Sequence, residues 1–443
     1  AYAHTDLSEF YGKLPFTLTG AQQRAVEEIL TDFRKGAPMN RLVQGDVGSG
    51  KTMVAAAAAL LAVQNGKQVA IMAPTEILAE QHFFTLGKLL EPLGVRLCLL
   101  TGSMKAKEKR IFREAIAAGQ IHVVIGTHAL LSETTEFQNL DMVIADEQHR
   151  FGVAQRAALS QKGKDPHILV MSATPIPRTL ALIMYGDLDV SILDELPPGR
   201  QPVDTFLVDE SYRSRLNAFI RKHVDAGNQV FVVCPAVELE EGQSMKAVED
   251  WAKTLQKTVF PDYKVALLHG QMKGAEKEEI MRSFAHRKAD ILVATTVVEV
   301  GVDVPNATLM VIEDADRFGL SQLHQLRGRV GRGRDKSFCV LFSQNKNPQT
   351  KSRLKAFCQT NDGFKIAEED LRLRGPGDFF GARQSGLPAF RVANLSCDLE
   401  TLKQAQEASK YWIERLGTAQ TAESQALRER IAQLFARSEA TMN

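Results

Sequence analysis

The chain has 443 residues, of which 44% are hydrophobic and 24% charged, and its formal net charge is +1. This length exceeds what one hydrophobic core usually supports, and the composition is typical of a globular protein with more than one domain. The near-neutral charge excludes a protein that binds nucleic acid through overall basicity, so any nucleic-acid surface has to be a local patch.

The five cysteines are scattered along the chain and never form a CxxC pair. This pattern favours a reducing compartment over a disulfide framework or a zinc site. No apolar run reaches membrane-spanning length, and the N-terminus has no signal-peptide pattern. We therefore expect an intracellular protein without a membrane segment.

Short runs rich in β-branched residues alternate with longer amphipathic stretches in the first half of the chain. This alternation predicts βαβ units and a parallel sheet. The expected strands are residues 41–44, 68–73, 97–100, 122–125, 142–145 and 167–171. Covering helices are expected at 21–33, 53–64 and 76–90, where apolar residues recur at helical spacing.

The stretch LDELPPGRQPV (193–203) contains a proline pair and a Pro-Gly step, which are typical of a linker. Beyond it the alternation restarts, with strands expected at 229–233, 265–268, 291–294, 309–312 and 338–342. We expect an α/β protein with two tandem parallel-sheet domains, 1–197 and 198–345. A helical C-terminal part, 346–443, completes the chain, and we expect no sequence-level repeat.

The segment GDVGSGKT matches the phosphate-loop pattern GxxxxGK[ST] between an expected strand and an expected helix. Its glycines let backbone N–H groups close around phosphates at the positive end of the helix. Lys51 would reach the terminal phosphates and Thr52 would ligate Mg²⁺. The alternative is a plain Gly/Ser turn. The proposed ATP-binding residues are Gly45, Asp46, Val47, Gly48, Ser49, Gly50, Lys51 and Thr52.

An apolar run ends in an acidic pair in MVIADEQH. Asp146 would hold Mg²⁺, and Glu147 would orient and deprotonate the attacking water. Standing alone, the pair would be read as a solvated turn after a buried strand. Together with the phosphate loop it predicts a site for Mg-ATP hydrolysis.

Closely spaced arginines occur in a glycine-rich setting in HQLRGRVGRGR. They could form a solvated basic turn or contact nucleic-acid phosphates. The sharper hypothesis is that Arg329 and Arg332 are arginine fingers that reach the γ-phosphate from the second domain. Such a finger accelerates hydrolysis by about 10³- to 10⁵-fold, so hydrolysis would depend on closure of the two domains.

These segments are part of a longer series. LTGAQ, GDVGSGKT, APTEILAEQH, GTHAL, DEQHRFGV, SATPIPRT, LLHGQMK, ATTVVEVGVDVPNA and QLRGRVGRG occur in the order of the superfamily 2 helicase motifs. Within that superfamily the chain resembles the RecG family of branched-DNA translocases, from about Leu14 into the tail. The resemblance implies two RecA-like domains and an ATP-dependent DNA helicase that uses ATP and Mg²⁺.

The resemblance also implies roles for residues that would be unremarkable alone. Phe16 and Gln22 would form the adenine site, and Gly301 and Asp303 would face the nucleotide cleft. Gln148, His149 and Gln325 would join the catalytic machinery. The residues expected to contact DNA or to couple it to ATP are Thr75, Glu76, Gly126, Thr127, His128, Ser172, Ala173, Thr174, His269, Gly270, Thr295 and Thr296.

A further segment follows the last helicase motif. In RecG and in the transcription-repair coupling factor this region forms a helical hairpin and an extended loop linked to translocation on duplex DNA. Here 363–375 is expected to be a helix, with a firm stop at 375–377 (Gly-Pro-Gly). Arg374, Arg383 and Gln384 would reach a phosphate or another domain. The alternative is a structural lid.

RecG proteins carry a large N-terminal wedge region, whereas this sequence reaches Phe16 almost at once. The wedge is either removed or naturally absent, which leaves fork specificity and strand separation open. The resemblance implies branched and duplex DNA as substrates, a single-stranded-DNA-binding protein as partner, a monomeric state and a bacterial cytoplasmic location. The alternative function is a duplex-translocating remodeller of protein–DNA complexes, without strand separation.

Overall fold

The computed structural model describes residues 2–146, 159, 161–174, 188–197, 201–235, 250–295, 304–333 and 335–379, with short helical stretches between 401 and 431. The chain forms two compact units. One comprises Ala1–Pro175 with Asp187–Ile366 and contains both sheets, and the other comprises Ile176–Gly186 with Ala367–Asn443. The first unit carries the sites discussed below.

The first half of that unit is built on a parallel sheet of seven strands, in the order β3-β4-β2-β5-β6-β1-β7. Its strands are β1 (Asn40–Gly45), β2 (Gln68–Met72), β3 (Leu97–Leu100), β4 (Val123–Gly126), β5 (Leu140–Asp146), β6 (His167–Ser172) and β7 (Asp189–Leu193). Its α-helices are α1 (Ser8–Lys13), α2 (Gly20–Arg34), α3 (Lys51–Gln64), α4 (Glu76–Leu90) and α5 (Ala106–Ala117).

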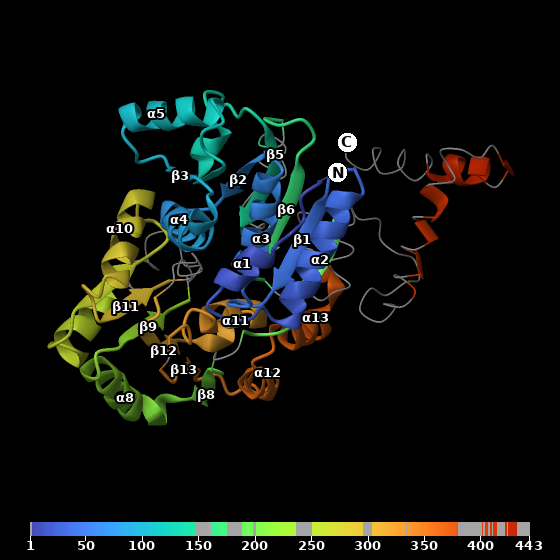
Figure 1. Ribbon diagram of the computed structural model, residues 1–443. Helices are drawn as coiled ribbons and strands as arrows, with labels where there is room; N and C mark the ends of the chain where they lie inside the picture. Colours follow the sequence, from blue (N-terminus) through green and yellow to red (C-terminus); the bar gives the residue numbers. More distant parts are fainter. Residues whose placement is uncertain are drawn as a thin grey trace, which may run out of the picture. The chain divides into compact units, whose positions relative to one another are not determined.

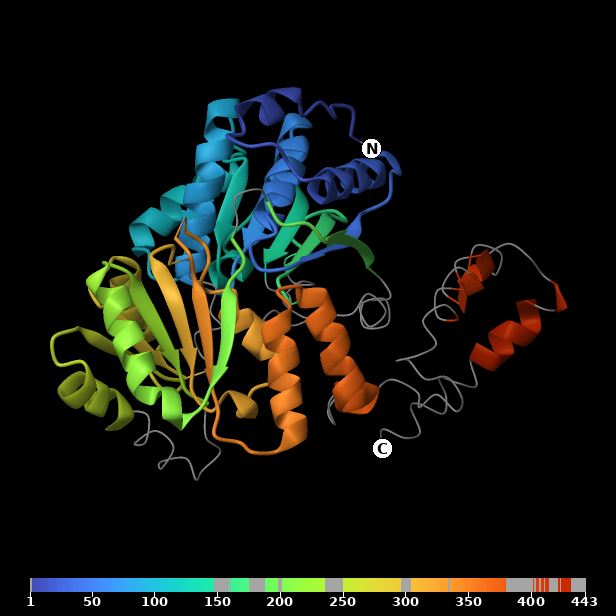
Figure 2. The same ribbon diagram turned by 90° about the horizontal axis from the view of Figure 1, so that it is seen from below.

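The second half is built on a parallel sheet of six strands, in the order β10-β11-β9-β12-β13-β8. Its strands are β8 (Asp204–Val208), β9 (Gln229–Val233), β10 (Val265–Leu268), β11 (Ile291–Ala294), β12 (Ala307–Ile312) and β13 (Phe338–Phe342). Its helices are α8 (Arg213–Asp225), α10 (Gly274–Ala285), α11 (Leu320–Arg327) and α12 (Pro348–Gln359). Figures 1 and 2 show the two halves side by side, blue to green and green to orange.

Short helical turns connect these elements. They are η1 (Glu91–Leu93), η2 (His128–Leu131), η4 (Glu210–Tyr212), η5 (Leu255–Val259) and η7 (Ala315–Arg317). Within the described part of the chain, every helix is too short or too polar to cross a membrane.

Both sheets are buried on both faces, which explains their apolar strands. In β5, Met142 and Ile144 belong to one apolar cluster, whereas Val143 belongs to the cluster on the opposite face. In β12, Met310 and Leu309 divide between two clusters in the same way. Because successive side chains of a strand point to opposite faces, such strands read as continuous hydrophobic runs. Helix α3, whose middle is VAAAAALLA, is almost wholly buried for the same reason.

The α/β fold with two parallel-sheet domains is confirmed, but two strands were not foreseen. Strands β7 and β8 are both edge strands: β7 pairs only with β1, and β8 pairs only with β13. Strand β7 (DVSIL) has Asp189 and Ser191 among its apolar residues, and β8 (DTFLV) begins with two polar residues and has no fully buried residue. Neither strand therefore shows the uninterrupted apolar run that marks the central strands.

The expected helix stop at 375–377 is wrong. Helix α13 (Gly363–Phe379) continues through Pro376. The fixed φ of proline lies in the helical range. Proline disfavours a helical conformation of the preceding residue, partly because its ring clashes with the Cβ of that residue. Gly375 has no Cβ, so this part of the barrier is missing.

The expectation that the sequence has no repeat is also wrong. NGKQVAIM (65–72) corresponds to AGNQVFVV (226–233), and LLTGSMKAKEK (99–109) corresponds to LLHGQMKGAEK (267–277). The first pair of segments covers β2 and β9, and the second covers β3 and β10 with the loops that follow them. The two halves therefore share sequence as well as topology.

Candidate nucleotide site

The phosphate loop lies between β1 and α3, as the sequence predicts. Gly48 and Gly50 have φ values of 78° and 82°, a left-handed conformation that favours glycine. A Cβ on Gly45 would lie 2.5 Å from Ser49 Oγ, so that position has no room for a side chain. The loop thus turns tightly into the N-terminus of α3, where backbone N–H groups and the helix dipole favour an anion.

Lys51 is folded over this loop. Its Nζ donates to the carbonyl oxygens of Gly45, at 2.8 Å, and of Asp46, at 2.9 Å. The ammonium group is therefore held at the loop by acceptors that a phosphate could replace. This placement suits the predicted contact of Lys51 with the terminal phosphates.

A cavity of about 630 Å³ lies over the loop and takes residues from both halves of the unit. The first half contributes Phe16, Gln22, Val47, Gly48, Gly50, Lys51, Thr52, Met53, Leu78, Gln81, His82, Phe84, Thr85, Asp146, Met171 and Ala173. Pro197, Pro305, Arg329 and Arg332 complete the lining. The cavity thus brings the predicted lysine, threonine and aspartate together with the two predicted arginine fingers.

Asp146 ends β5 and lines the cavity. Its Oδ2 lies 2.8 Å from Nε2 of His82, a buried residue of α4 that sequence reasoning missed. The signal for His82 was its spacing of four residues from Leu78, on the buried face of α4. In the part of the chain that the structure describes, no group of three His, Cys, Asp or Glu residues could hold a metal. Thr52 and Asp146, the predicted magnesium ligands, both line the cavity.

Gln22 and Phe16, the predicted adenine residues, both line the cavity. Gln22 forms a capping box with Thr19 at the start of α2, and its Nε2 donates to Ser49 O at 2.8 Å. Phe16 is 45% exposed, as a ring available for stacking would be. Their contact with the base stays a prediction. Phe84, which is 65% exposed, is a second cavity aromatic that the sequence analysis missed.

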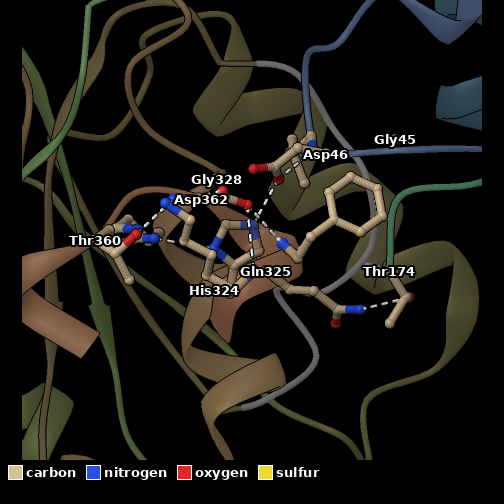
Figure 3. A network of polar contacts seen from close by, with 12 residues as sticks. Gly45, Asp46, Thr174, His324, Gln325, Gly328, Thr360 and Asp362 are labelled. Carbon is tan, nitrogen blue, oxygen red and sulfur yellow. Dashed lines mark hydrogen bonds and ion pairs between the residues drawn. The ribbon is translucent and has the colours of Figure 1, made fainter. Parts of the chain in front are cut away.

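The second half reaches the site through α11 and the loop after it. Gln325 Nε2 donates to Thr174 Oγ1 at 2.8 Å, and Gln44 Nε2 donates to Thr174 O at 3.3 Å. Thr174 is therefore bonded both to β1 and to α11. Arg329 is buried, and Arg332 Nε donates to Gly328 O at 3.2 Å. Figure 3 shows this contact of Gln325 with Thr174 beside a second one, between His324 and Asp46.

His324 and Arg327 also belong to this site, although the sequence analysis gave them no role. His324 Nε2 lies 2.6 Å from Asp46 Oδ1 in the phosphate loop. Arg327 Nη2 lies 3.0 Å from Nδ1 of the same ring. Burial alone would raise the pKa of Asp46. The hydrogen bonds from His324 and the Val47 N–H, with the charge of Lys51, hold that pKa below its usual value. The carboxylate is thus ionised at neutral pH.

Several of the predicted DNA residues lie where their strands end. Gly126 ends β4, Ser172 ends β6, and Thr295 directly follows β11. In the first half, Thr75 Oγ1 accepts from Leu78 N and begins α4. The others with described positions are Glu76, Thr127, His128, Ala173, His269 and Gly270. Their contacts with DNA stay predictions.

Some predicted site residues lie outside the described residues. They are Glu147, Gln148, His149, Thr296, Gly301, Asp303, Arg383 and Gln384. Arg374 lies within α13, but its side chain is likewise outside the description.

The chain has two parallel-sheet domains, and one cavity takes a phosphate loop from the first and arginines from the second. These features define a two-domain P-loop ATPase core of the helicase type. Three family models match the chain in agreement with this. They describe a DEAD/DEAH box helicase domain (19–183), a helicase conserved C-terminal domain (212–334) and domain 3 of the ATP-dependent DNA helicase RecG (360–439). The chain belongs to the RecG family.

Curated relatives give the extent of the likeness. The chain is 54% identical to an ATP-dependent DNA helicase RecG from Synechocystis over 91% of its own length and 49% of that protein. It is 49% identical to the Bacillus subtilis RecG over 92% of its own length and 60% of that protein. A solved structure of RecG bound to a three-way DNA junction matches 89% of this chain and 51% of that one, with 47% identity and a TM-score of 0.77. The chain thus spans about half to three fifths of the length of these relatives.

Proposed function

We propose that this chain is the motor part of an ATP-dependent DNA helicase. It would translocate on double-stranded DNA and couple ATP hydrolysis to branch migration and fork regression, in DNA recombination and repair. The observation that carries the proposal is the cavity that both halves line. Lys51, Thr52 and Asp146 line it from the first half, and Arg329 and Arg332 from the second.

The chemistry of these groups fits hydrolysis of Mg-ATP. Mg²⁺, held by Thr52 and Asp146, would neutralise charge on the phosphates. Lys51 would bind the terminal phosphates. Arg329 and Arg332 would stabilise the charge that develops as the γ-phosphate leaves. The predicted roles of Glu147, Gln148 and His149 in orienting the attacking water belong to the same proposal.

The DNA substrate is proposed from the relatives and from the loops at the strand ends. A solved relative is bound to a three-way DNA junction. Loops with small and hydroxyl side chains position a backbone without reading its sequence. In this proposal the segment after α12, with Arg374, Arg383 and Gln384, converts domain closure into movement of duplex. The relatives named RecG favour this function over a remodeller that resembles the coupling factor.

The organisation and setting of the protein are part of the proposal. The motor would consist of domains 1–197 and 198–345, with the translocation segment in 346–443. It would act as a monomer in the bacterial cytoplasm, with a single-stranded-DNA-binding protein as a partner. Bacterial relatives and the scattered cysteines support this setting.

The test is steady-state ATP hydrolysis with no DNA, single strands, blunt duplex and a model fork. Lys51→Ala serves as the blank, because it removes the cation from the phosphate loop. We expect duplex and fork to stimulate ATP hydrolysis, and we expect Lys51→Ala to abolish this stimulation. Stimulation by single strands alone would overturn the duplex-translocation proposal.

A further inference from the structure

A continuous polar chain runs from the phosphate loop through α11 to the end of α12. Asp46 is bonded to His324, and His324 to Arg327. Arg327 Nη1 in turn donates to Thr360 O at 2.8 Å and to Phe357 O at 3.3 Å. Figure 3 shows the contact of His324 with Asp46 at the start of this chain. We call Asp46, His324 and Arg327 the latch.

The partners of His324 determine which nitrogen carries its proton. A guanidinium group only donates hydrogen bonds, so Nδ1 of His324 must accept from Arg327. Nε2 of His324 therefore donates the hydrogen bond to the Asp46 carboxylate. The ring thus links a buried cation to a carboxylate.

Arg327 is fixed from several sides, so it fixes His324 in turn. Its guanidinium carbon lies 4.3 Å from the centroid of the Phe357 ring. Its two carbonyl partners are at the C-terminal end of α12, where a cation is favourable because the helix dipole is negative there. Burial lowers the pKa of Arg327, yet arginine stays charged at neutral pH. The imidazole therefore has a rigid support on the side away from the phosphate loop.

The Asp46 end of the latch is also fixed. Oδ1 of Asp46 accepts a hydrogen bond from the Val47 N–H at 2.6 Å, and the carbonyl oxygen of Asp46 accepts one from Lys51 Nζ. The carboxylate of Asp46 thus points to the second half, and its backbone belongs to the phosphate loop. This side chain faces α11 through a contact that the motif alone does not indicate.

An independent observation places the arginine fingers next to the latch. A Cβ on Gly328, the residue after α11, would lie 2.9 Å from Cβ of Val47. The backbone that leads into Arg329 therefore lies directly against the phosphate loop. A shift of α11 along the loop would carry Arg329 with it.

We propose that Asp46 and His324 are positioning residues that set Arg329 and Arg332 over the phosphate loop when the two halves are closed. The inference rests on the proposed ATP hydrolysis and adds to it a contact that holds the fingers in place. The latch would act on the rate of hydrolysis at saturating ATP, because misplacing a reacting group by about 1 Å can cost about 100-fold in rate. It would act little on ATP binding, which the phosphate loop supplies.

The test compares substitutions at His324 that differ in one hydrogen bond. His324→Gln keeps an N–H donor near Nε2, whereas His324→Asn keeps an acceptor near Nδ1, and His324→Leu keeps neither. We expect His324→Leu and His324→Asn to lower kcat for duplex-stimulated hydrolysis by about 10- to 100-fold, with less change in KM for ATP. Asp46→Leu should lower kcat as much. The single variant His324→Gln should keep most of the parent rate. Combined with Asp46→Leu, it should leave the rate as low as in Asp46→Leu alone.

A matched control is the ion pair of Arg282 with Glu80, which also joins the two halves, at 3.0 Å. Its side chains are 49% and 34% exposed, so Glu80→Gln should leave kcat near the parent value. Equal loss in Glu80→Gln and His324→Leu would show general weakening between the halves and overturn a specific latch. Parent-level kcat in His324→Leu would overturn it as well.

A second readout does not depend on hydrolysis. Hydrogen–deuterium exchange of the intact chain should rise several-fold in His324→Leu over the phosphate loop and α11, and stay unchanged over β2 and β9. Unchanged exchange over the loop would overturn the latch even if the parent proved inactive. If the parent hydrolysed no ATP with any DNA but showed this exchange pattern, the proposed function would be overturned and the latch would stand.

Discussion

The two sheet-based halves of the main unit differ least at the strand starts and most at the strand ends. Gln68 and Gln229 begin β2 and β9, and each is buried. Gln68 Nε2 donates to Ile116 O and Ile121 O, and Gln229 Nε2 donates likewise to Phe284 O and Ala289 O. The same amide thus holds the helix after β3 and the helix after β10 at this edge.

At the opposite edge the halves have diverged. In both, a lysine one turn into a helix donates to a glycine carbonyl of the preceding loop, Lys109 to Gly102 and Lys277 to Gly270. Beyond that, the first half contributes the phosphate loop, whereas the second contributes Arg329 to the cavity. The shared contacts thus maintain the fold, while the proposed chemistry depends on what each half adds at its strand ends.

The largest expected effect tests the asymmetry of the strand ends. Arg329→Ala and Arg332→Ala should each lower kcat for DNA-stimulated hydrolysis by about 10³- to 10⁵-fold, because the γ-phosphate would lose a cation from the second half. Steady-state kinetics at saturating ATP measures this. Nucleotide affinity, measured by equilibrium titration, should change much less. Parent-level hydrolysis in both variants would mean that the second half supplies no catalytic cation.

A smaller effect tests the symmetry of the strand starts. Gln68→Leu and Gln229→Leu should each lower the free energy of unfolding by about 1–3 kcal/mol, since two buried carbonyl groups lose their donor. Urea denaturation followed by circular dichroism measures both variants. Similar losses would support equivalent roles, whereas a loss in only one half would show that the two glutamines are not equivalent.

The lysine contacts should matter less to stability. Lys109→Met and Lys277→Met should each change the free energy of unfolding by no more than about 0.5 kcal/mol, because both side chains are partly exposed. If the loops that they hold contact DNA, duplex affinity should fall in both variants. Binding measured at several salt concentrations checks this, and an effect on unfolding larger than on binding would contradict it.

The smallest effect concerns the contact of Glu278, in the second half, with Glu76, in the first half. Burial raises the pKa of Glu278, as do the charges of Glu76 and Glu80. The hydrogen bond from the Glu76 N–H and the charge of Arg282 oppose this rise. A raised carboxyl pKa favours the folded state when the group is protonated, and this stability is lost as pH rises from the ordinary value of 4.5 through the folded value.

Glu278→Gln should therefore raise Tm at pH 7, by about 1 °C, and the difference should vanish below pH 4.5. Thermal unfolding at both pH values measures this, with Glu279→Gln, an exposed neighbour, as the control. A variant less stable than the parent at pH 7 would show that the ionised carboxylate stabilises the fold.

Sequence patterns predicted the central strands because burial on both faces leaves uninterrupted apolar runs, as in β9. Edge strand β8 was missed because it begins with the polar residues Asp204 and Thr205. The helix through Pro376 was missed because Gly375 relaxes the usual conflict. The phosphate loop was predictable because its geometry requires glycine at Gly48 and Gly50. The roles of His82 and His324 could not be assigned, since their carboxylate partners, Asp146 and Asp46, lie 64 and 278 residues away in sequence and only the fold brings them together.

The separation of fold-maintaining contacts from catalytic ones has a consequence for the cell. The glutamines at the strand starts keep each half folded whether or not ATP is turned over. Under the proposed function, a variant that lacks only Arg329 would keep both halves folded while hydrolysis stops. It would then bind DNA without moving along it, and one defective copy would obstruct its working counterparts.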